Sequence, residues 1–525
     1  MTAPMERRRV VALLALGLCA SSPAEEPAAL LERLSRKESQ LADLSADFWR
    51  AQYRIALGDR EASTLMIRER MRKVLTEPEL LEALSRTTFG DPVAERRRRF
   101  FLEEAADSRI SADPELSALV DELEKIYAAA RFEAVGKRLT RAELNTVIAR
   151  EPDRSKRRQA WEARAQLASL ASDRVRKAMA LRQKLAERYA GGTYPEFLLR
   201  RNQVDRASML AWFEEIRRET QPEFERLSAR MRGDLGVETL EPWDIDFFFG
   251  RLSGESVDAA LPRDKAWPRV QALTRSLGYD LAKLPVKLEV ADIAFGGGTY
   301  PIRYGKEVRI LVNAYDGLLF TDTLLHETGH ALHYVFDDEP TFLLQSNYAQ
   351  PFDEGLSQVM SLLLYRAEIS AKFLGLTEER VRALREVYRL SSLFDLRQRI
   401  ASSLFEFEAY ASLEADFAAL DDRLFQRHVG VSTHGLPVWA FNPFYATGPV
   451  YQQSYVLAEM VGRQIHDAID QRFGRAWGPE AGAYLKAKFF RRGGTLTLDE
   501  ILTEGTGRPL SAASLIAALK ASGQP

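Results

Sequence analysis

Helical periodicity runs through almost the whole sequence, and patterns typical of strands are concentrated in one short stretch. From residue 28 to about 150, apolar residues recur at the spacing of amphipathic helices, among many Leu, Ala, Glu and Arg. Residues 154–189 continue this pattern up to Gly191 and Gly192. Short apolar runs typical of strands lie between Val286 and Val312. The sequence therefore predicts a mainly α fold with one small β-sheet.

The chain of 525 residues is long enough to bury a large core without covalent cross-links. It has no repeat of fixed period and no low-complexity linker. We therefore expect one domain over residues 25–525, with a weak divide near residues 236–264. This divide separates a helical N-terminal half, about 25–250, from a second half, about 251–525.

The first 24 residues are typical of a secretory signal peptide. Three arginines at 7–9 precede an apolar run over residues 10–20, which is too short to span a membrane comfortably. Small residues at 22–24 give a cleavage pattern, so Glu25 is the expected mature start. We expect a periplasmic or secreted protein. A buried N-terminal helix is one alternative, and a lipoprotein attached through Cys19 is another.

Composition excludes several functional classes. Cys19 is the only cysteine, so the mature chain is expected to lack disulfides, a thiol nucleophile and cysteine metal ligands. The 73 Lys and Arg residues balance 75 Asp and Glu residues, which gives no general basic surface for nucleic acid. No later apolar run is long enough for a transmembrane anchor. We expect a monomer that binds no nucleic acid.

Two histidines four residues apart carry the strongest chemical signal. His326 and His330 fall on one face of a helix predicted over 321–336, so both imidazoles can converge on one Zn²⁺. Glu327, the next residue after His326, is placed to act as a general base on water at the metal. Only six histidines occur in the chain, so a chance pair with this spacing is rare. We expect Thr321 or Asp322 to cap this helix.

A catalytic zinc site needs a third protein ligand and one open position. Glu354 is the candidate, 24 residues beyond His330, near the start of a second predicted helix. Pro351 and Asp353 favour a helix start there. Asp353 is the alternative third ligand.

The segments HETGHALH (326–333) and EGLSQ (354–358) resemble the thimet oligopeptidase and oligoendopeptidase family of zinc peptidases. They also resemble angiotensin-converting enzyme, a relative of the same gluzincin type. The resemblance extends weakly over about 150–470. It implies a helical ellipsoid with a deep central cleft, one Zn²⁺ per chain on the cleft floor, and a small sheet beside the zinc-binding helix.

The same resemblance implies further site residues. Gly296, Gly297 and Gly298 resemble the edge strand that pairs with the substrate backbone, and glycines permit such close approach. A plain turn is the alternative. Tyr455 matches the tyrosine that stabilises the oxyanion, on a helix expected to open at 447–449. Tyr451, one turn earlier, shares its expected face, although a core role for Tyr455 is the alternative.

Four positions depart from the pattern of these families. Tyr445 stands where they carry a histidine, and Gln452 stands where they carry a second tyrosine. Pro443 stands where angiotensin-converting enzyme carries the lysine that anchors a substrate carboxylate. Ser454 stands where that enzyme carries its chloride-binding arginine. These changes argue against dipeptide release and chloride activation, but they leave the hydrolytic residues intact. We retain Tyr445 and Tyr451 as expected substrate contacts.

The sequence thus predicts an exported zinc peptidase that hydrolyses short peptides in an enclosed cleft. A dipeptide-releasing carboxypeptidase of the angiotensin-converting-enzyme type is the main alternative. A thermolysin-like endopeptidase, an aminopeptidase and a non-catalytic peptide-binding relative are the others. His333, His428 and His466 have no expected chemistry.

Overall fold

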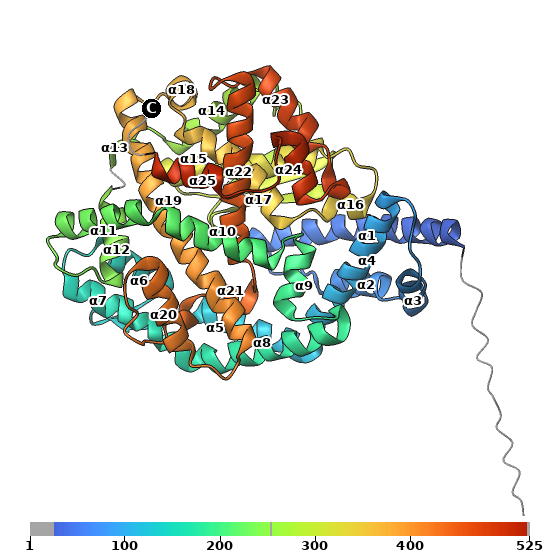
Figure 1. Cartoon of the computed structure of the whole chain (residues 1–525), viewed down its shortest axis with the longest axis horizontal. Helices are drawn as coiled ribbons and strands as arrows, with labels where there is room; N and C mark the ends of the chain where they lie inside the picture. The colour runs from blue at the N-terminus through green and yellow to red at the C-terminus, as the bar shows by residue number, and fades with distance from the viewer. Residues whose placement is uncertain (1–25, 253–254, 294, 522–525) are drawn as a thin grey trace, which may run out of the picture.

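The computed structural model describes residues 26–252, 255–293 and 295–521 (Figure 1). The predicted signal peptide, residues 1–24, and Cys19 within it lie outside these residues. No helix in the described part of the chain combines the length and the apolar character needed to cross a bilayer.

Helices dominate the described residues, which confirms the predicted mainly α fold. Those before the central sheet are α1 Pro27–Ala56, α2 Leu65–Leu75, α3 Pro78–Arg86, α4 Pro92–Ser111, α5 Pro114–Ala129, α6 Arg141–Arg150, α7 Arg154–Ala163, α8 Ala168–Ala190, α9 Tyr194–Arg201, α10 Arg206–Glu219, α11 Gln221–Leu235, α12 Pro242–Leu252, α13 Glu255–Asp258 and α14 Arg263–Ser276. Those after it are α15 Gly317–Phe336, α16 Phe342–Ser346, α17 Gln350–Leu362, α18 Ala367–Ile369, α19 Glu378–Ala411, α20 Phe417–Val429, α21 Phe444–Thr447, α22 Gln452–Phe473, α23 Pro479–Leu485, α24 Leu498–Thr506 and α25 Ala513–Lys520.

A three-stranded sheet lies directly before α15 in the chain, where the sequence predicts it. Its strands are β3 Val286–Ala291, β4 Gly297–Arg303 and β5 Glu307–Asn313, in the order β3-β5-β4. β5 is the central strand and pairs parallel with β3 and antiparallel with β4. Its apolar residues are buried on both faces, which suits this position. β4 is therefore an edge strand.

A second, two-stranded sheet interrupts the region predicted to be helical. β1 Phe132–Ala134 and β2 Lys137–Leu139 form an antiparallel hairpin. Val135 and Gly136, the two residues of its turn, both have positive φ, as a tight hairpin turn requires. The helical expectation over 28–150 is wrong at this point, because three-residue strands are too short to show a period in the sequence.

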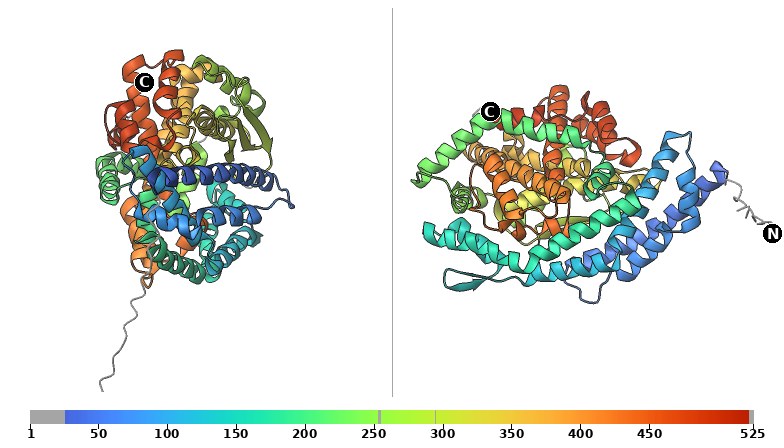
Figure 2. Two further views of the ribbon diagram at one scale, coloured as in Figure 1. Left: turned by 90° about the vertical axis from the view of Figure 1, so that its right-hand side faces the viewer. Right: turned by 60° about the horizontal axis from the view of Figure 1, so that its bottom comes forward.

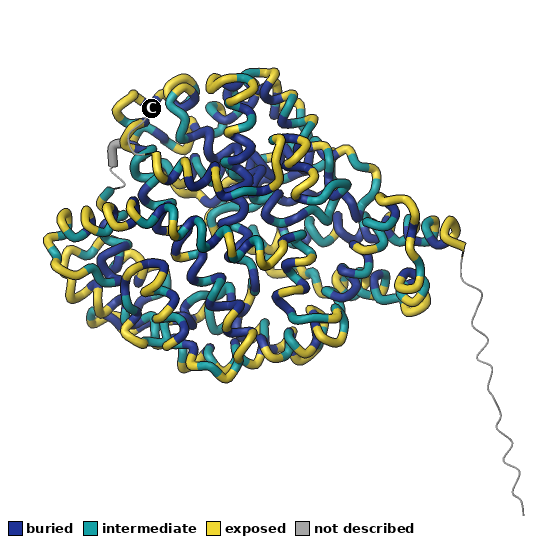
Figure 3. Tube along the Cα trace, viewed as in Figure 1, coloured by how far each residue is buried: buried dark blue, intermediate teal, exposed yellow. Residues whose placement is uncertain are grey.

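One hydrophobic core joins the two halves of the chain. Its buried residues run from Ala106 to Leu519, so helices on both sides of the weak sequence divide contribute to it. Buried segments gather in the centre of the molecule and exposed segments on its rim (Figure 3). A smaller cluster packs α1 to α4 against Leu343 and Leu344 of α16.

The long helix α1 crosses the edge of the three-stranded sheet (Figure 2). Tyr53 and Trp49 of α1 pack edge-on against the ring of Tyr300 in β4, with centroid distances of 5.3 and 6.3 Å. The N-terminal helix therefore covers part of β4.

Helix α17 packs closely against both α15 and α22, and these three helices carry the three predicted metal ligands, Glu327 and Tyr455. A Cβ atom added to Gly329 of α15 would lie 2.5 Å from Cα of Ser357 in α17. One added to Gly355 of α17 would overlap the side chain of Val461 in α22. These two glycines therefore allow the backbones to approach closely.

This packing predicts the effect of Gly329→Ala. The added methyl group must push α17 away, so we expect a loss of about 1–3 kcal/mol in the free energy of unfolding. Metal affinity should fall as well, because α17 carries Glu354. Gly233→Ala is a matched control, since this exposed helical glycine has open space around its Cβ position. There we expect a gain of about 0.5–1 kcal/mol. Urea unfolding and zinc titration of both variants check the prediction, and equal effects of the two would contradict it.

The zinc-motif helix begins earlier than the sequence predicts. α15 starts at Gly317, whose N–H donates to the Asp316 carboxylate at 2.9 Å. Asp258 of α13 accepts from the next N–H at 2.9 Å. The caps expected at Thr321 or Asp322 are therefore wrong. The carboxylates of Asp316 and of Asp258, which is distant in the chain, satisfy the first N–H groups of the helix one turn earlier.

Candidate active site

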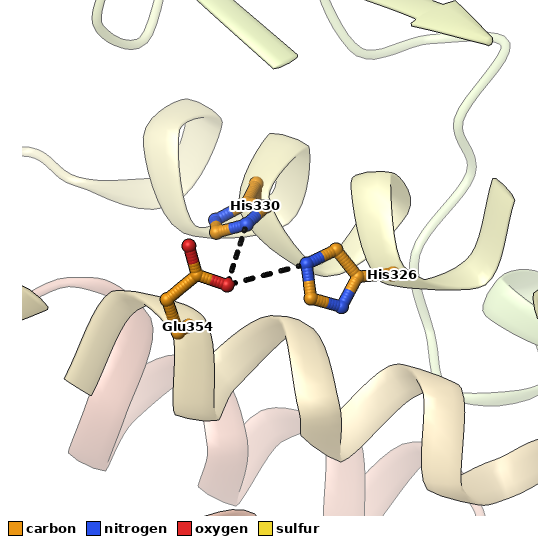
Figure 4. Close-up of side chains that lie close together, drawn as sticks. All are labelled: His326, His330 and Glu354. Atoms are coloured by element: carbon orange, nitrogen blue, oxygen red, sulfur yellow. Dashed lines mark ion pairs between the residues drawn. The ribbon is translucent and has the colours of Figure 1, made fainter. Parts of the chain in front are cut away.

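Two histidines and one carboxylate converge between α15 and α17 (Figure 4). Oε2 of Glu354 lies 3.4 Å from Nε2 of His326 and 3.9 Å from Nε2 of His330. Ligand atoms around a tetrahedral zinc ion stand about 3.4 Å apart, given zinc–ligand distances of about 2.0–2.2 Å. The three predicted metal-binding residues are therefore brought together in a spacing that fits zinc.

Asp353 contacts the Nδ1 side of His330 and His333, away from the Nε2 atom of His330 that faces Glu354. Its carboxylate accepts a hydrogen bond from the Tyr334 hydroxyl at 2.8 Å and lies 2.8 Å from Nδ1 of His333. It also lies 3.2 Å from Nδ1 of His330. A carboxylate at Nδ1 places the proton there and leaves Nε2 free for a metal. Of the two candidates for the third ligand, the geometry favours Glu354.

Each oxygen of Glu354 has a distinct neighbour. The Tyr451 hydroxyl donates to Oε1 at 2.7 Å, which leaves Oε2 facing the two histidines. Burial and the nearby Glu354 charge hold the pKa of Tyr451 well above its usual range, so this phenol stays a neutral donor. Tyr451 therefore fixes the orientation of the carboxylate.

The electrostatic field of the cluster favours a bound cation. Burial lowers the pKa of His330, but the carboxylates of Asp353, Glu354 and Glu327 together outweigh burial and raise this pKa to about 10. Burial raises the pKa of Glu354, yet the hydrogen bond with His326 and the charge of His330 lower it overall. Buried carboxylates that favour positive charge, together with two imidazole nitrogens, form a donor set suited to Zn²⁺.

Glu327 faces the same cavity, which has a volume of about 330 Å³. Only 6% of its surface is exposed. The Thr299 hydroxyl in β4 lies 2.8 Å from Oε2 of Glu327 and 2.9 Å from its backbone carbonyl. Sequence reasoning missed Thr299, because nothing local to β4 indicates a contact with a helix 28 residues away.

The glycine segment lies where the sequence places it, beside the zinc-motif helix. Gly297 and Gly298 line the cavity and pair with Val312 and Leu311 of β5. The Gly296 carbonyl accepts from the backbone N–H of Asn313 at 2.8 Å. The segment is the start of an edge strand and not a plain turn. Its pairing with a substrate backbone stays a prediction.

Tyr455 and Tyr451 also line the cavity, and their ring centroids are 5.1 Å apart. Burial, and then the Glu354 charge, raise the pKa of Tyr455, so its hydroxyl is a neutral hydrogen-bond donor. α22 begins at Gln452, later than the predicted opening at 447–449. Val450 adopts positive φ just before it, and this turn directs Tyr451 toward the cavity.

The structure places Tyr445 away from the cavity, so its expected substrate contact is not found. Its side chain is buried, with a ring centroid 4.8 Å from that of Phe405. Its hydroxyl points toward the Ser402 carbonyl at 3.5 Å. The short helix α21 turns this side chain into the core. The alignment with other families matches positions in the chain and could not show the direction of the side chain.

The remaining histidines differ in their surroundings. His333 is fully buried and belongs to the Asp353 network. Burial lowers the pKa of His428 to about 4, and burial likewise lowers that of His466 far below its usual range. His428 and His466 are neutral core residues, and His333 is a supporting residue near the site.

Comparison with known proteins shows which fold this is. No family model and no curated protein sequence matches the chain. Among solved structures, it is similar to an M32 carboxypeptidase from Deinococcus radiodurans R1, with a TM-score of 0.67 and 14% identity. It is also similar to metallocarboxypeptidase 1 of Trypanosoma cruzi, with a TM-score of 0.66 and 14% identity. Each match covers 94% of this chain and at least 98% of the other.

At this identity the likeness establishes the fold alone. The chain therefore has the helical fold of these two carboxypeptidases over nearly its full length. The resemblance of the motifs to thimet oligopeptidase and angiotensin-converting enzyme stays a prediction.

Proposed function

We propose that this chain is a zinc-dependent peptidase that hydrolyses short peptides. The observation that carries the proposal is the convergence of His326, His330 and Glu354 on one cavity that Glu327 and Tyr455 also line. His326, His330 and Glu354 would hold a bound Zn²⁺. The ion would act as a Lewis acid that lowers the pKa of water and polarises a carbonyl.

The protein groups then have separate tasks. The Glu327 carboxylate accepts the proton of the attacking water and later passes it to the leaving amine. The Tyr455 hydroxyl donates a hydrogen bond to the oxygen that becomes negative as the carbonyl is attacked. Thr299 and Tyr451 hold the two carboxylates of Glu327 and Glu354 in their directions.

The two similar structures are both carboxypeptidases, which supports hydrolysis of peptides from the carboxyl end. Export to the periplasm or the medium is also part of the proposal, and it rests on the N-terminal sequence alone. One zinc ion per chain and a monomeric state are also part of the proposal, and both rest on the sequence analysis.

Product analysis tests the proposal directly. The mature chain, loaded with zinc, is incubated with a mixed peptide library, and the products are identified by mass spectrometry. Cleavage that disappears with a chelator and returns with zinc supports the peptidase. The products distinguish three modes of cleavage. A carboxypeptidase releases single C-terminal residues, a dipeptide-releasing enzyme releases C-terminal dipeptides, and an endopeptidase cuts internal bonds. A folded, zinc-loaded chain that cleaves no peptide would overturn the proposal and favour a peptide-binding protein.

Tyr455→Phe removes the proposed oxyanion donor with little change in shape. We expect kcat to fall by about 10²–10³-fold, because a single such donor contributes that much. Zinc content should not change, since in the described part of the chain the Tyr455 hydroxyl makes no hydrogen bond to the three side chains that would hold the ion, whereas Tyr451 bonds Glu354. Tyr484→Phe serves as a matched control, because the Tyr484 hydroxyl bonds the Gly505 carbonyl, far from the cavity. An unchanged kcat in Tyr455→Phe would assign this tyrosine to the core.

A further inference from the structure

A buried arginine from the N-terminal half of the chain holds the segment that leads into the cavity tyrosines. Arg182 of α8 has only 4% of its surface exposed. Its Nη1 donates to the Tyr445 carbonyl at 3.2 Å, and its Nη2 donates to the Ala446 carbonyl. Both carbonyls belong to α21, a helix of four residues that packs against α8. A guanidinium is costly to bury unless acceptors meet its donors in a fixed geometry, so these bonds hold α21 in place.

The helix α21 in turn contacts both cavity tyrosines. The ring of Phe444, its first residue, lies 5.9 Å from that of Tyr451 and 6.4 Å from that of Tyr455, measured between centroids. Gly448 leaves room for this ring, since a Cβ atom there would lie 3.1 Å from Cδ1 of Phe444. Phe444 is therefore a wall against which the two tyrosine rings pack.

We propose that Arg182 is a positioning residue for Tyr451 and Tyr455. The arginine fixes the backbone of α21, and Phe444 transmits this position to the two rings. For Tyr455 the proposal rests on the proposed peptidase function. For Tyr451 it does not, because the bond of that hydroxyl to Glu354 requires no substrate.

The expected consequence follows from the precision that the two hydroxyls need. A displacement of about 1 Å at a reacting group can lower a rate by about 10²-fold. When α21 is free to shift, the Tyr455 hydroxyl moves away from the oxygen that it would stabilise. The Tyr451 hydroxyl likewise loses its alignment with the Glu354 carboxylate.

A buried arginine that bonds carbonyls also stabilises a fold, so a matched control is needed. Arg397 of α19 is 1% exposed. Its terminal nitrogens donate to the carbonyls of Arg217 and His428, at 2.7 and 3.4 Å. These two residues belong to α10 and α20, neither of which contributes a residue to the described lining of the cavity. Arg397→Lys therefore reports the loss of stability alone.

Two double-mutant cycles test the assignment. Arg182→Lys keeps the charge but cannot bond both carbonyls in the same geometry. We expect it to lower kcat by about 10-fold, with KM changed less than about twofold. In the Tyr455→Phe background it should lower kcat by less than about twofold, because the donor that it positions is already absent.

The second cycle measures zinc affinity by competition with a chromophoric chelator and needs no turnover. Arg182→Lys should weaken zinc binding by about 3- to 10-fold, part of the loss of about 10- to 100-fold that removal of an outer contact causes. In the Tyr451→Phe background the further loss should be less than about twofold.

The outcomes separate positioning from stability. Arg397→Lys should lower the midpoint of thermal unfolding as Arg182→Lys does, and leave kcat and zinc affinity unchanged. Phe444→Leu breaks the same path without touching the buried arginine, and it should show the same coupling if Arg182→Lys does not fold. Equal losses in both backgrounds, or equal losses with Arg397→Lys, overturn the assignment. A chain that binds zinc but cleaves no peptide refutes the peptidase, and the zinc cycle still decides the role of Arg182 toward Tyr451.

Discussion

Glu327→Gln is expected to lower kcat by about 10²–10⁴-fold, the contribution of a well-placed general base. The carboxylate is buried beside the two histidines and accepts a hydrogen bond from the Thr299 hydroxyl at 2.8 Å. Glutamine has the same size and keeps a carbonyl oxygen for Thr299, but it cannot accept a proton from water. The fold and the metal-binding side chains should therefore remain as they are.

Three measurements check this expectation: kcat on a cleaved peptide, zinc content by elemental analysis, and the midpoint of thermal unfolding. Only kcat should change. Glu378→Gln is a matched control, because Glu378 is exposed at the start of α19 and far from the cavity in sequence and structure. If Glu327→Gln kept a tenth or more of the wild-type kcat, another group would have to serve as the base.

Glu354→Ala and Asp353→Asn should affect the metal very differently, although the two residues are adjacent. Glu354→Ala removes one of three donors, so we expect no stoichiometric zinc after dialysis. Asp353→Asn keeps all three donors but weakens the support of His330, so we expect a zinc affinity about 10- to 100-fold lower. It should also destabilise the fold by about 1–3 kcal/mol, because a buried group that bonds His333 and Tyr334 loses its charge.

Competition with a chromophoric chelator measures the zinc affinity of each variant, and urea unfolding measures stability. The opposite ranking, with zinc retained by Glu354→Ala and lost by Asp353→Asn, would make Asp353 the third ligand. Asp338→Asn is a suitable control for the loss of one negative charge, since Asp338 is an exposed residue that pairs with Arg491.

The two histidines of the His/His/Glu cluster could be predicted because their signal is local. His326 and His330 are four residues apart, and the turn of a helix alone brings them to one face. Glu354 falls near the start of a second helix, and Pro351 at the second position of that helix is a local start signal. The choice between Glu354 and Asp353 could not be made from the sequence, since it depends on how α17 is rotated against α15.

Residues whose roles depend on distant contacts escaped prediction or were placed wrongly. Thr299 reaches the cavity from β4, and no spacing in the sequence links it to the histidines. The alignment with other families predicts Tyr445 at the substrate, but the short helix α21 turns its side chain into the core. The early start of α15 likewise depends on Asp258, from another helix.

The sequence by itself determined the helical character of this protein, the place of its small sheet and the placement of His326 and His330 on one face of a helix. Each of these follows from interactions between residues that are neighbours in the chain, and their periods are visible in the amino-acid order. Only the tertiary structure decided which carboxylate faces the histidines and which tyrosines reach the cavity. Those outcomes depend on the packing of helices far apart in the chain, where glycines such as Gly329 and Gly355 set the distance between backbones.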